Sequence, residues 1–156
     1  MAKRNISHIT DQYNILREIS KQVTAFDESL HTLLNDLIET MQAVNGVGIA
    51  APQVGILKRV FIIENPENEG VIEFVNPVIV KSSGNKTEVE GCLSVPKQTG
   101  YVNRPKKVEV KAQDRFGNEF IYKTVDPLTC SAICHETDHL NGVLFIDKLV
   151  EEPVKK

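Results

Sequence analysis

Asp126-Pro-Leu-Thr-Cys-Ser-Ala-Ile-Cys-His-Glu-Thr-Asp-His-Leu140 is the segment around which we expect the chain to fold. Asp126 is a suitable N-cap, Pro127 favours the first helical position and Gly142 is a suitable stop, which predicts a helix over about residues 127–140. The helix contains an H-E-x-x-H pattern at residues 135–139. Residues four apart lie one above the other on a helix, so His135 and His139 can bind one metal ion.

Glu136 lies about 100° round the helix from His135, where its carboxylate can reach a metal-bound water without being a ligand. A bound cation lowers the pKa of such a water toward ~7, and the carboxylate can then move its protons. The alternative is a solvated helix with two surface histidines. Two of the four histidines of the chain fall in this motif, on a helix with clear start and stop signals, which favours the metal site.

A catalytic site of this kind usually has three protein ligands, so the motif needs a partner. One class of H-E-x-x-H enzymes takes a third histidine shortly after the motif, but Phe145 occupies that position. Too few residues follow His139 for another helix to return to the site, so we expect the ligand upstream. The candidates are His8, His31, Cys92 and many carboxylates.

Cys92 is the favoured third ligand because it stands in Glu90-Gly-Cys-Leu-Ser-Val-Pro96. Gly91 gives backbone freedom before the thiol, Pro96 stiffens the exit, and a thiolate is a recognised partner for two imidazoles. Cys130 and Cys134 also stand four apart on the predicted helix and form a rival pair. They lie on a different face from the histidines, so we expect them to be buried core residues.

Composition places the chain among single-domain globular proteins, and further sequence features predict that it is not exported. It has 156 residues, a net charge of −3, 25% charged residues and 6% aromatic residues, which argues against a nucleic-acid binder. Three cysteines do not form a secreted disulfide framework. The N-terminus lacks a signal peptide and no apolar run is long enough to cross a membrane, so we expect a cytosolic protein.

The remaining sequence predicts a second helix and several strands. The apolar stripe is spaced for a helix over residues 27–45, with Asp27 as its cap. Strands are expected at residues 60–63 and at residues 71–80, with a break at Asn76-Pro77.

A hairpin is expected around a turn at residues 114–117, with strands at 108–112 and 120–122, and the tail 151–156 is expected to be solvated or disordered. The predicted fold is therefore α+β, in one domain over residues 1–156. Mainly antiparallel sheets would pack around the metal-binding H-E-x-x-H helix, with a second amphipathic helix.

Gly46-Val-Gly-Ile-Ala-Ala51 resembles a loose dinucleotide-binding fingerprint, but its context is wrong. A nucleotide site needs a strand before the glycines and a helix after them, whereas here a helix precedes and Pro52 follows. The segment instead delivers Gln53, whose amide could donate a hydrogen bond to an oxyanion. A structural turn and a catalytic donor are equally good interpretations at this point.

Three segments together resemble the signature motifs of peptide deformylases, namely residues 46–55, 90–94 and 135–139. They occur in the order of that family and at similar separations. The flanks Ile15–Ser20 and Leu140–Leu149 also resemble the family, so the likeness covers nearly the whole chain.

The resemblance implies a role for each of these residues. The metal would be held by Cys92, His135 and His139, with water as the fourth ligand. Glu136 would act as general base and then as general acid. The Gln53 side chain and the Leu93 backbone N–H would stabilise the oxyanion.

The implied substrate is an N-formyl-methionyl nascent peptide, which is hydrolysed to formate and a free amino terminus. The peptide would lie along a strand edge, with Gly48 at a position that matches such contact. Contact with the ribosome would be transient, without direct nucleic-acid readout or membrane binding. The bacterial-type location is the cytoplasm, with an organelle stroma or matrix as the alternative.

The ligand set leaves the metal open between two ions. Two imidazoles and a thiolate suggest Zn²⁺ by softness and intrinsic affinity, whereas the resemblance implies Fe²⁺. We expect Fe²⁺, with Zn²⁺ as the alternative.

Two residues depart from the family pattern or stand unexplained within it. Ser131 stands where the family often has an aliphatic residue near the methionine pocket, so we expect a methionine affinity weaker by ~1 kcal/mol unless another residue compensates. Asp138 cannot point at the metal together with the histidines, and we expect it to pair with Arg104.

Two other classes of function remain as alternatives. A small metallopeptidase could use the same helix to cleave internal peptide bonds. A non-catalytic domain could use the metal for stability alone.

Overall fold

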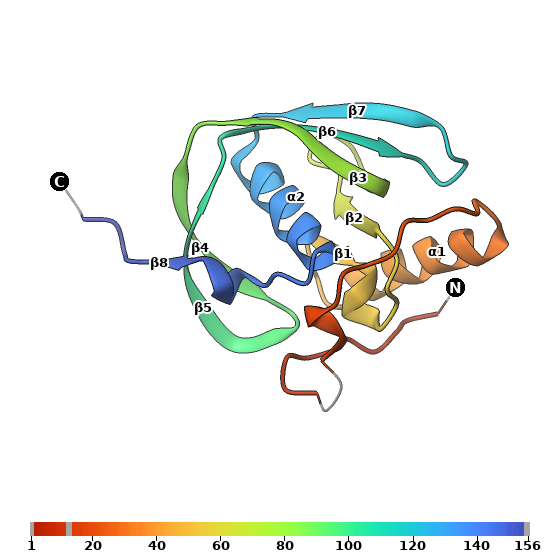
Figure 1. Ribbon diagram of the computed structural model, residues 1–156, viewed down its shortest axis with the longest axis horizontal. Helices are drawn as coiled ribbons and strands as arrows, with labels where there is room; N and C mark the ends of the chain where they lie inside the picture. Colours follow the sequence, from red (N-terminus) through yellow and green to blue (C-terminus); the bar gives the residue numbers. More distant parts are fainter. Residues whose placement is uncertain (1, 12–13, 155–156) are drawn as a thin grey trace.

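The computed structural model describes residues 2–11 and 14–154, and its centre is helix α2, Pro127–Leu140 (Figure 1). Asp126 caps the helix by accepting a hydrogen bond from the Thr129 backbone N–H at 2.9 Å. Gly142 follows the helix with a φ of +72°, a conformation that favours glycine. The predicted bounds of this helix are confirmed.

A five-stranded antiparallel sheet packs against α2, in the order β1-β2-β3-β6-β7. Its strands are β1 (Gly48–Ala50), β2 (Val60–Glu64), β3 (Val71–Ser83), β6 (Lys107–Gln113) and β7 (Glu119–Thr124). The predicted hairpin is confirmed, since β6 and β7 pair in register from Val108–Thr124 to Gln113–Glu119. Figure 1 shows this sheet arching over one side of the helix.

The predicted break at Asn76-Pro77 was wrong, because β3 continues through it as one strand. The register with β6 shifts between Val75 and Val78, which is a bulge rather than an end. Asn76 adopts a φ of +51°, and its amide nitrogen donates to the Val23 carbonyl at 2.9 Å and to the Gln113 side chain at 2.8 Å. These contacts hold the irregular backbone in place.

A second, three-stranded antiparallel sheet has the order β4-β5-β8. Its strands are β4 (Lys86–Cys92), β5 (Val95–Arg104) and β8 (Leu149–Val150). The sequence pattern did not predict this sheet, since β4 carries charged residues at alternate positions. In Figure 1 it lies along α2, on the side that faces away from the helix of residues 28–43.

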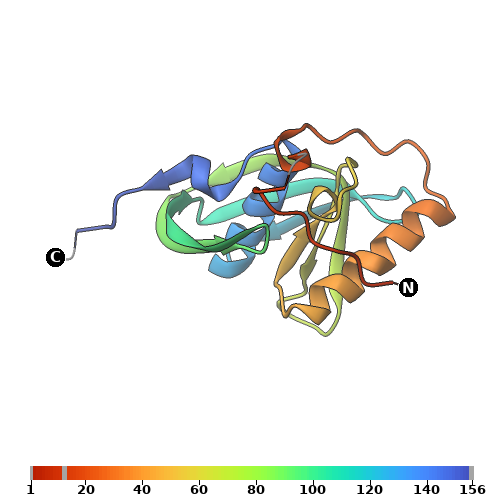
Figure 2. The same ribbon diagram turned by 90° about the horizontal axis from the view of Figure 1, so that it is seen from below.

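The second helix, α1, spans Glu28–Ala43 and begins at Asp27, whose carboxylate accepts from the Leu30 N–H at 3.3 Å. Its apolar stripe packs against β1 and β2, and Figure 2 shows the helix beside the sheet rather than on α2. Within the described residues there are also three short 3₁₀ helices: η1 (Ile15–Arg17), η2 (Ala51–Val54) and η3 (Phe145–Lys148). The α+β class, with antiparallel sheets and two α-helices in the described residues, is confirmed.

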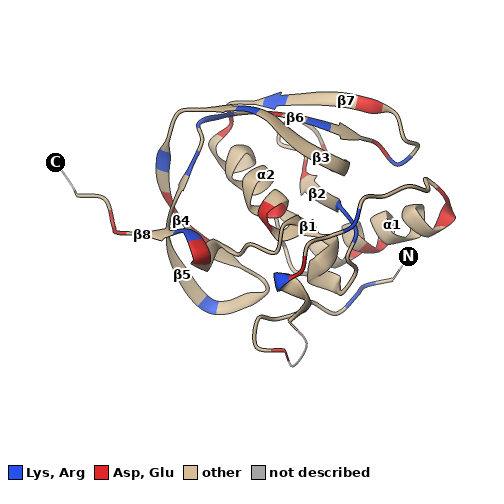
Figure 3. Cartoon of the chain, in the orientation of Figure 1, with Lys and Arg blue, Asp and Glu red and all other residues tan. Residues whose placement is uncertain are grey.

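The C-terminal segment 151–154 is exposed and has no regular secondary structure, while residues 155–156 of the predicted solvated tail lie outside the described residues. Acidic and basic residues alternate over the ribbon without a large region of one sign (Figure 3). Within the described chain, none of the helices combines the length and apolarity that a bilayer span requires.

Candidate metal centre

The structure brings Cys92, His135 and His139 together, with one ligand atom of each within 4.8 Å of the others. Cys92 lies at the end of β4, and its Sγ is 3.3 Å from Nε2 of His139. A thiolate with two imidazoles is a donor set that binds Zn²⁺ and Fe²⁺. The residues therefore fit a metal ion.

Glu90 holds the ring of His135, a contact that the sequence analysis missed. Its Oε1 is 2.9 Å from Nδ1 of His135, which leaves Nε2 of that ring for a metal. Glu90 stands two residues before Cys92, so both side chains lie on the same face of β4, but the sequence pattern did not predict that strand.

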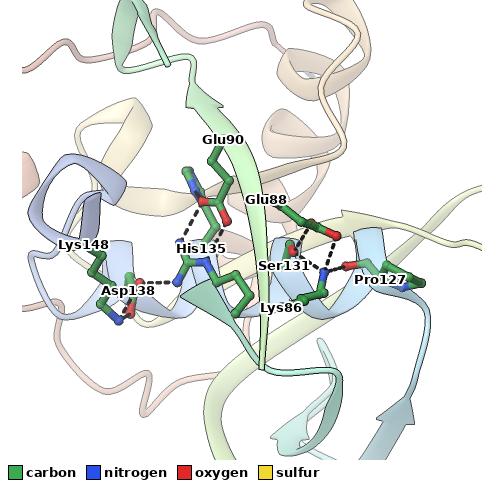
Figure 4. A network of polar contacts seen from close by, with 9 residues as sticks. Lys86, Glu88, Glu90, Pro127, Ser131, His135, Asp138 and Lys148 are labelled. Atoms are coloured by element: carbon green, nitrogen blue, oxygen red, sulfur yellow. Dashed lines mark hydrogen bonds and ion pairs between the residues drawn. The ribbon is translucent and has the colours of Figure 1, made fainter. Parts of the chain in front are cut away.

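Arg104 holds Glu90 in turn through a two-pronged ion pair, with Nε–Oε2 at 2.7 Å and Nη2–Oε1 at 2.8 Å. Its Nη1 also donates to Oδ2 of Asp138 at 2.9 Å, which confirms the predicted Asp138–Arg104 pair. Lys148 approaches the same carboxylate at 3.1 Å (Figure 4). Burial raises the pKa of Glu90, but hydrogen bonds from Arg104 and His135 outweigh burial and lower the pKa to about 2.

Glu136 is buried, with only 4% of its surface exposed, and its Oε1 has no hydrogen-bond partner among the described residues. Burial raises the pKa of this carboxyl to about 7, because the charged form is poorly solvated there. A carboxyl group whose pKa lies near neutral pH can both accept and return a proton.

The two histidines differ in their protonation without a metal. Burial lowers the pKa of His139 well below its usual value, so this imidazole is neutral and ready to be a ligand. Burial also lowers the pKa of His135, but hydrogen bonds that the protonated ring donates to Cys92 and Glu90 outweigh burial and raise the pKa to about 10. Metal binding at His135 therefore releases a proton.

Gln53 lies in η2 with its side chain directed at Cys92. Its Oε1 accepts from the Ala50 N–H at 2.9 Å, while its Nε2 lies 3.7 Å from Cys92 Sγ and 3.3 Å from Ser94 Oγ. The carbonyl end is thus anchored and the NH₂ end is presented to the site. This geometry favours the donor interpretation over a turn alone.

A cavity of about 560 Å³ opens beside these residues. Elements β1, β4 and α2 supply most of its walls, and its lining includes Gly48, Gln53, Leu93, Ser131, His135 and Glu136. Gly48 lies against Glu136, since a Cβ added to it would be 2.9 Å from Oε2. The cavity therefore unites every predicted catalytic and substrate-binding residue with part of the metal centre.

The other candidate ligands have structural roles. His31 lies at α1, where its Nε2 is 2.9 Å from the Arg115 carbonyl oxygen. Cys130 and Cys134 are buried in the core that joins α2 to the large sheet, as expected. Burial raises the pKa of the Cys134 thiol to about 11, which disfavours the thiolate.

Comparison with known proteins gives one consistent result. The chain matches the family described as polypeptide deformylase over residues 3–155. It is 53% identical over 150 residues to a peptide deformylase of Caldicellulosiruptor bescii, covering 96% of this chain and 87% of that protein. It is 49% identical over 151 residues to peptide deformylase 1 of Clostridium acetobutylicum, covering 97% of both.

Solved structures agree. A crystal structure of a peptide deformylase from Legionella pneumophila aligns with a TM-score of 0.89 at 46% identity, covering 96% of this chain and 87% of that one. The peptide deformylase of Thermotoga maritima also aligns with a TM-score of 0.89, at 36% identity and over 97% and 100% of the two chains.

Proposed function

The chain belongs to the polypeptide deformylase family, and from this premise we propose how its own residues carry out the family's reaction. Members of the family are metal-dependent hydrolases that remove the N-formyl group from nascent polypeptides, and the chain is a hydrolase of this kind. Its substrates are nascent chains that begin with N-formylmethionine, and its products are formate and a free amino terminus.

We propose that Cys92, His135 and His139 hold the metal. When bound, the ion acts as a Lewis acid and makes a nucleophilic water available near neutral pH. Both Fe²⁺ and Zn²⁺ fit one thiolate and two imidazoles. We propose Fe²⁺ as the active ion because the family resemblance implies it, with Zn²⁺ as the alternative. Activity that falls in air as iron and Cys92 are oxidised would support Fe²⁺, whereas equal activity in air with only zinc present would contradict it.

Glu136 is the residue that moves protons in this proposal. As a carboxylate it takes a proton from the attacking water, and as a carboxylic acid it gives a proton to the departing amine. Its burial and its pKa of about 7 support both roles. The cavity beside it has room for the formyl group and the first residue.

The formyl oxygen becomes negatively charged when water attacks the carbonyl carbon. We propose that the Gln53 amide and the Leu93 backbone N–H donate hydrogen bonds to it, since both residues line the cavity. Gly48 lets the substrate backbone lie close to β1, and Ser131 forms part of the wall around the methionine side chain.

The wider setting also belongs to this proposal. We propose that residues 1–156 form one catalytic domain, which acts in the cytoplasm and meets the ribosome transiently as chains emerge. We propose neither direct nucleic-acid readout nor membrane binding.

The observation that carries the proposal is the grouping of Cys92, His135 and His139 within 4.8 Å beside the buried Glu136. A formate-release assay on formyl-Met-Ala-Ser under anaerobic conditions, with elemental analysis of the same sample, tests it. Formate release with about one metal per chain is expected. Cleavage of casein without formate release would instead favour a metallopeptidase.

A further inference from the structure

Side chains of strand β4 contact helix α2 in a regular series, and Figure 4 shows the contacts of Lys86, Glu88 and Glu90. Two residues of a strand rise about 6.6 Å and four residues of a helix about 6 Å, so alternate strand residues can meet every fourth helical residue. Four successive contacts follow this spacing: Lys86 with Pro127, Glu88 with Ser131, Glu90 with His135, and Cys92 with His139. The last two build the metal centre, and the first two have no assigned role.

The Lys86 ammonium group uses all three of its N–H donors. It donates to the Pro127 carbonyl at 2.6 Å, to Ser131 Oγ at 2.8 Å and to Glu88 Oε1 at 2.9 Å. The Lys86 side chain is 13% exposed, so this charge is largely withdrawn from water. A lysine ammonium offers three donors, and here each has an acceptor.

The Ser131 hydroxyl is occupied by the same pair. It donates its only proton to Glu88 Oε2 at 3.0 Å and accepts from Lys86. Ser131 lines the cavity, whereas Lys86 and Glu88 are not among the described residues that form its wall. The hydroxyl thus has no free proton to offer to a bound side chain.

We propose that Lys86 and Glu88 are positioning residues for substrate specificity, acting through Ser131. They form hydrogen bonds with the Ser131 hydroxyl and hold β4 against α2. Because the hydroxyl is occupied, the cavity wall stays suited to the apolar side chain of the first peptide residue. The pair is therefore the compensation for a serine in this wall. This inference rests on the proposed function, because it assigns the cavity to the first residue of a formylated peptide.

Lys86→Met tests the proposal by leaving Glu88 unpaired beside the cavity. The KM for formyl-Met-Ala-Ser should rise roughly tenfold while kcat changes by less than about twofold, since the reacting groups are untouched. Glu88→Gln, which keeps the shape of the side chain, should raise KM in the same direction. It serves as the second variant if Lys86→Met does not fold.

The double variant Lys86→Met/Glu88→Leu separates positioning from simple loss of stability. The Lys86 side chain is 13% exposed and the Glu88 side chain is 36% exposed. Replacing both members of this partly buried pair by apolar groups should cost less than removing one, so KM should return to within roughly threefold of the parent value. Lys111→Met is the matched control, because Lys111 is 51% exposed and its partner Glu119 is 3.7 Å away. A lowered melting temperature with an unchanged KM in Lys86→Met would overturn the proposal.

Binding without turnover keeps this test separate from that of the proposed function. Metal-loaded Glu136→Gln and Glu136→Gln/Lys86→Met would be titrated with formyl-Met-Ala-Ser by calorimetry. Weaker binding by Glu136→Gln/Lys86→Met than by Glu136→Gln supports the positioning role. It does so even if the parent protein releases no formate, because the absence of formate release would contradict only the proposed function. Equal binding, including no binding by either protein, overturns the positioning role.

Discussion

Glu90 and His135 are joined by a 2.9 Å contact between Oε1 and Nδ1, which ties the metal-binding helix to the strand that ends in Cys92. The contact leaves Nε2 of His135 directed toward the ligand cluster. Arg104 holds both oxygens of this carboxylate, including the Oε1 that contacts His135, so the orientation of the ring depends on a buried ion pair. Ligand geometry here is thus maintained by residues that do not touch the metal.

Glu90→Gln should weaken metal binding by roughly 10–100-fold, because an outer carboxylate orients the imidazole and raises its basicity. Competition with a chromophoric chelator measures this affinity. Glu109→Gln is the control, because Glu109 lies on β6 and pairs with Lys123 at 3.7 Å. Equal affinities for the parent and Glu90→Gln would contradict the role of Glu90.

The low pKa of Glu90 predicts a pH-dependent stability of the metal-free protein. A carboxyl whose pKa falls from 4.5 to about 2 on folding stabilises the fold fully above pH 4.5. That contribution is lost as the pH falls toward 2, because the folded carboxylate is then protonated. Urea unfolding of parent and Glu90→Gln should differ more at pH 6 than at pH 3, and a constant difference would refute the prediction.

Gly48→Ala should lower kcat by at least about tenfold while metal content stays unchanged, since misplaced catalytic groups lose rate steeply. The added Cβ would meet Glu136 Oε2 at 2.9 Å and its Cγ at 3.2 Å, which forces the carboxylate to move. Gly46→Ala is the comparison, because its added Cβ meets its nearest neighbour, Met41 Cγ, at 3.4 Å. A Gly48→Ala enzyme as fast as Gly46→Ala would show that Glu136 tolerates displacement.

The three thiols should react at different rates once the metal is removed. Cys92 is partly exposed, whereas Cys130 and Cys134 are buried and burial raises the pKa of Cys134 to about 11. Iodoacetamide at pH 8 should therefore modify Cys92 first, as mass spectrometry of digests would show. Bound metal should protect Cys92, and equal labelling with and without metal would argue against its role as a ligand.

Local signals predicted both α-helices and the β6–β7 hairpin, because caps, apolar spacing and turn residues lie within each element. Strand β4 was not predicted, because the face that it turns to α2 carries Lys86, Glu88 and Glu90 rather than apolar residues. Their partners stand about 40 residues away in the sequence, at Pro127, Ser131 and His135. A one-dimensional pattern cannot reveal charges that are satisfied at such separations.

More of the candidate site than of the small sheet could be predicted from the sequence. Spacing predicted that His135 and His139 share one helix face. The short segment after the motif indicated an upstream third ligand, and the local sequence favoured Cys92 among the upstream candidates. The role of Glu90 was not predicted, because Glu90 is neither a metal ligand nor a helix cap. Its contact with His135 depends on how β4 and α2 are aligned with each other.

The most direct test of the account is formate release by Glu136→Gln, with metal content measured on the same sample. We predict that the variant keeps its metal and loses at least ~10²-fold in rate, because the group that moves protons is gone while the three ligands remain. Cys92→Ala, by contrast, should lose the metal. A Glu136→Gln protein that retains both its metal and the parent rate would contradict the account.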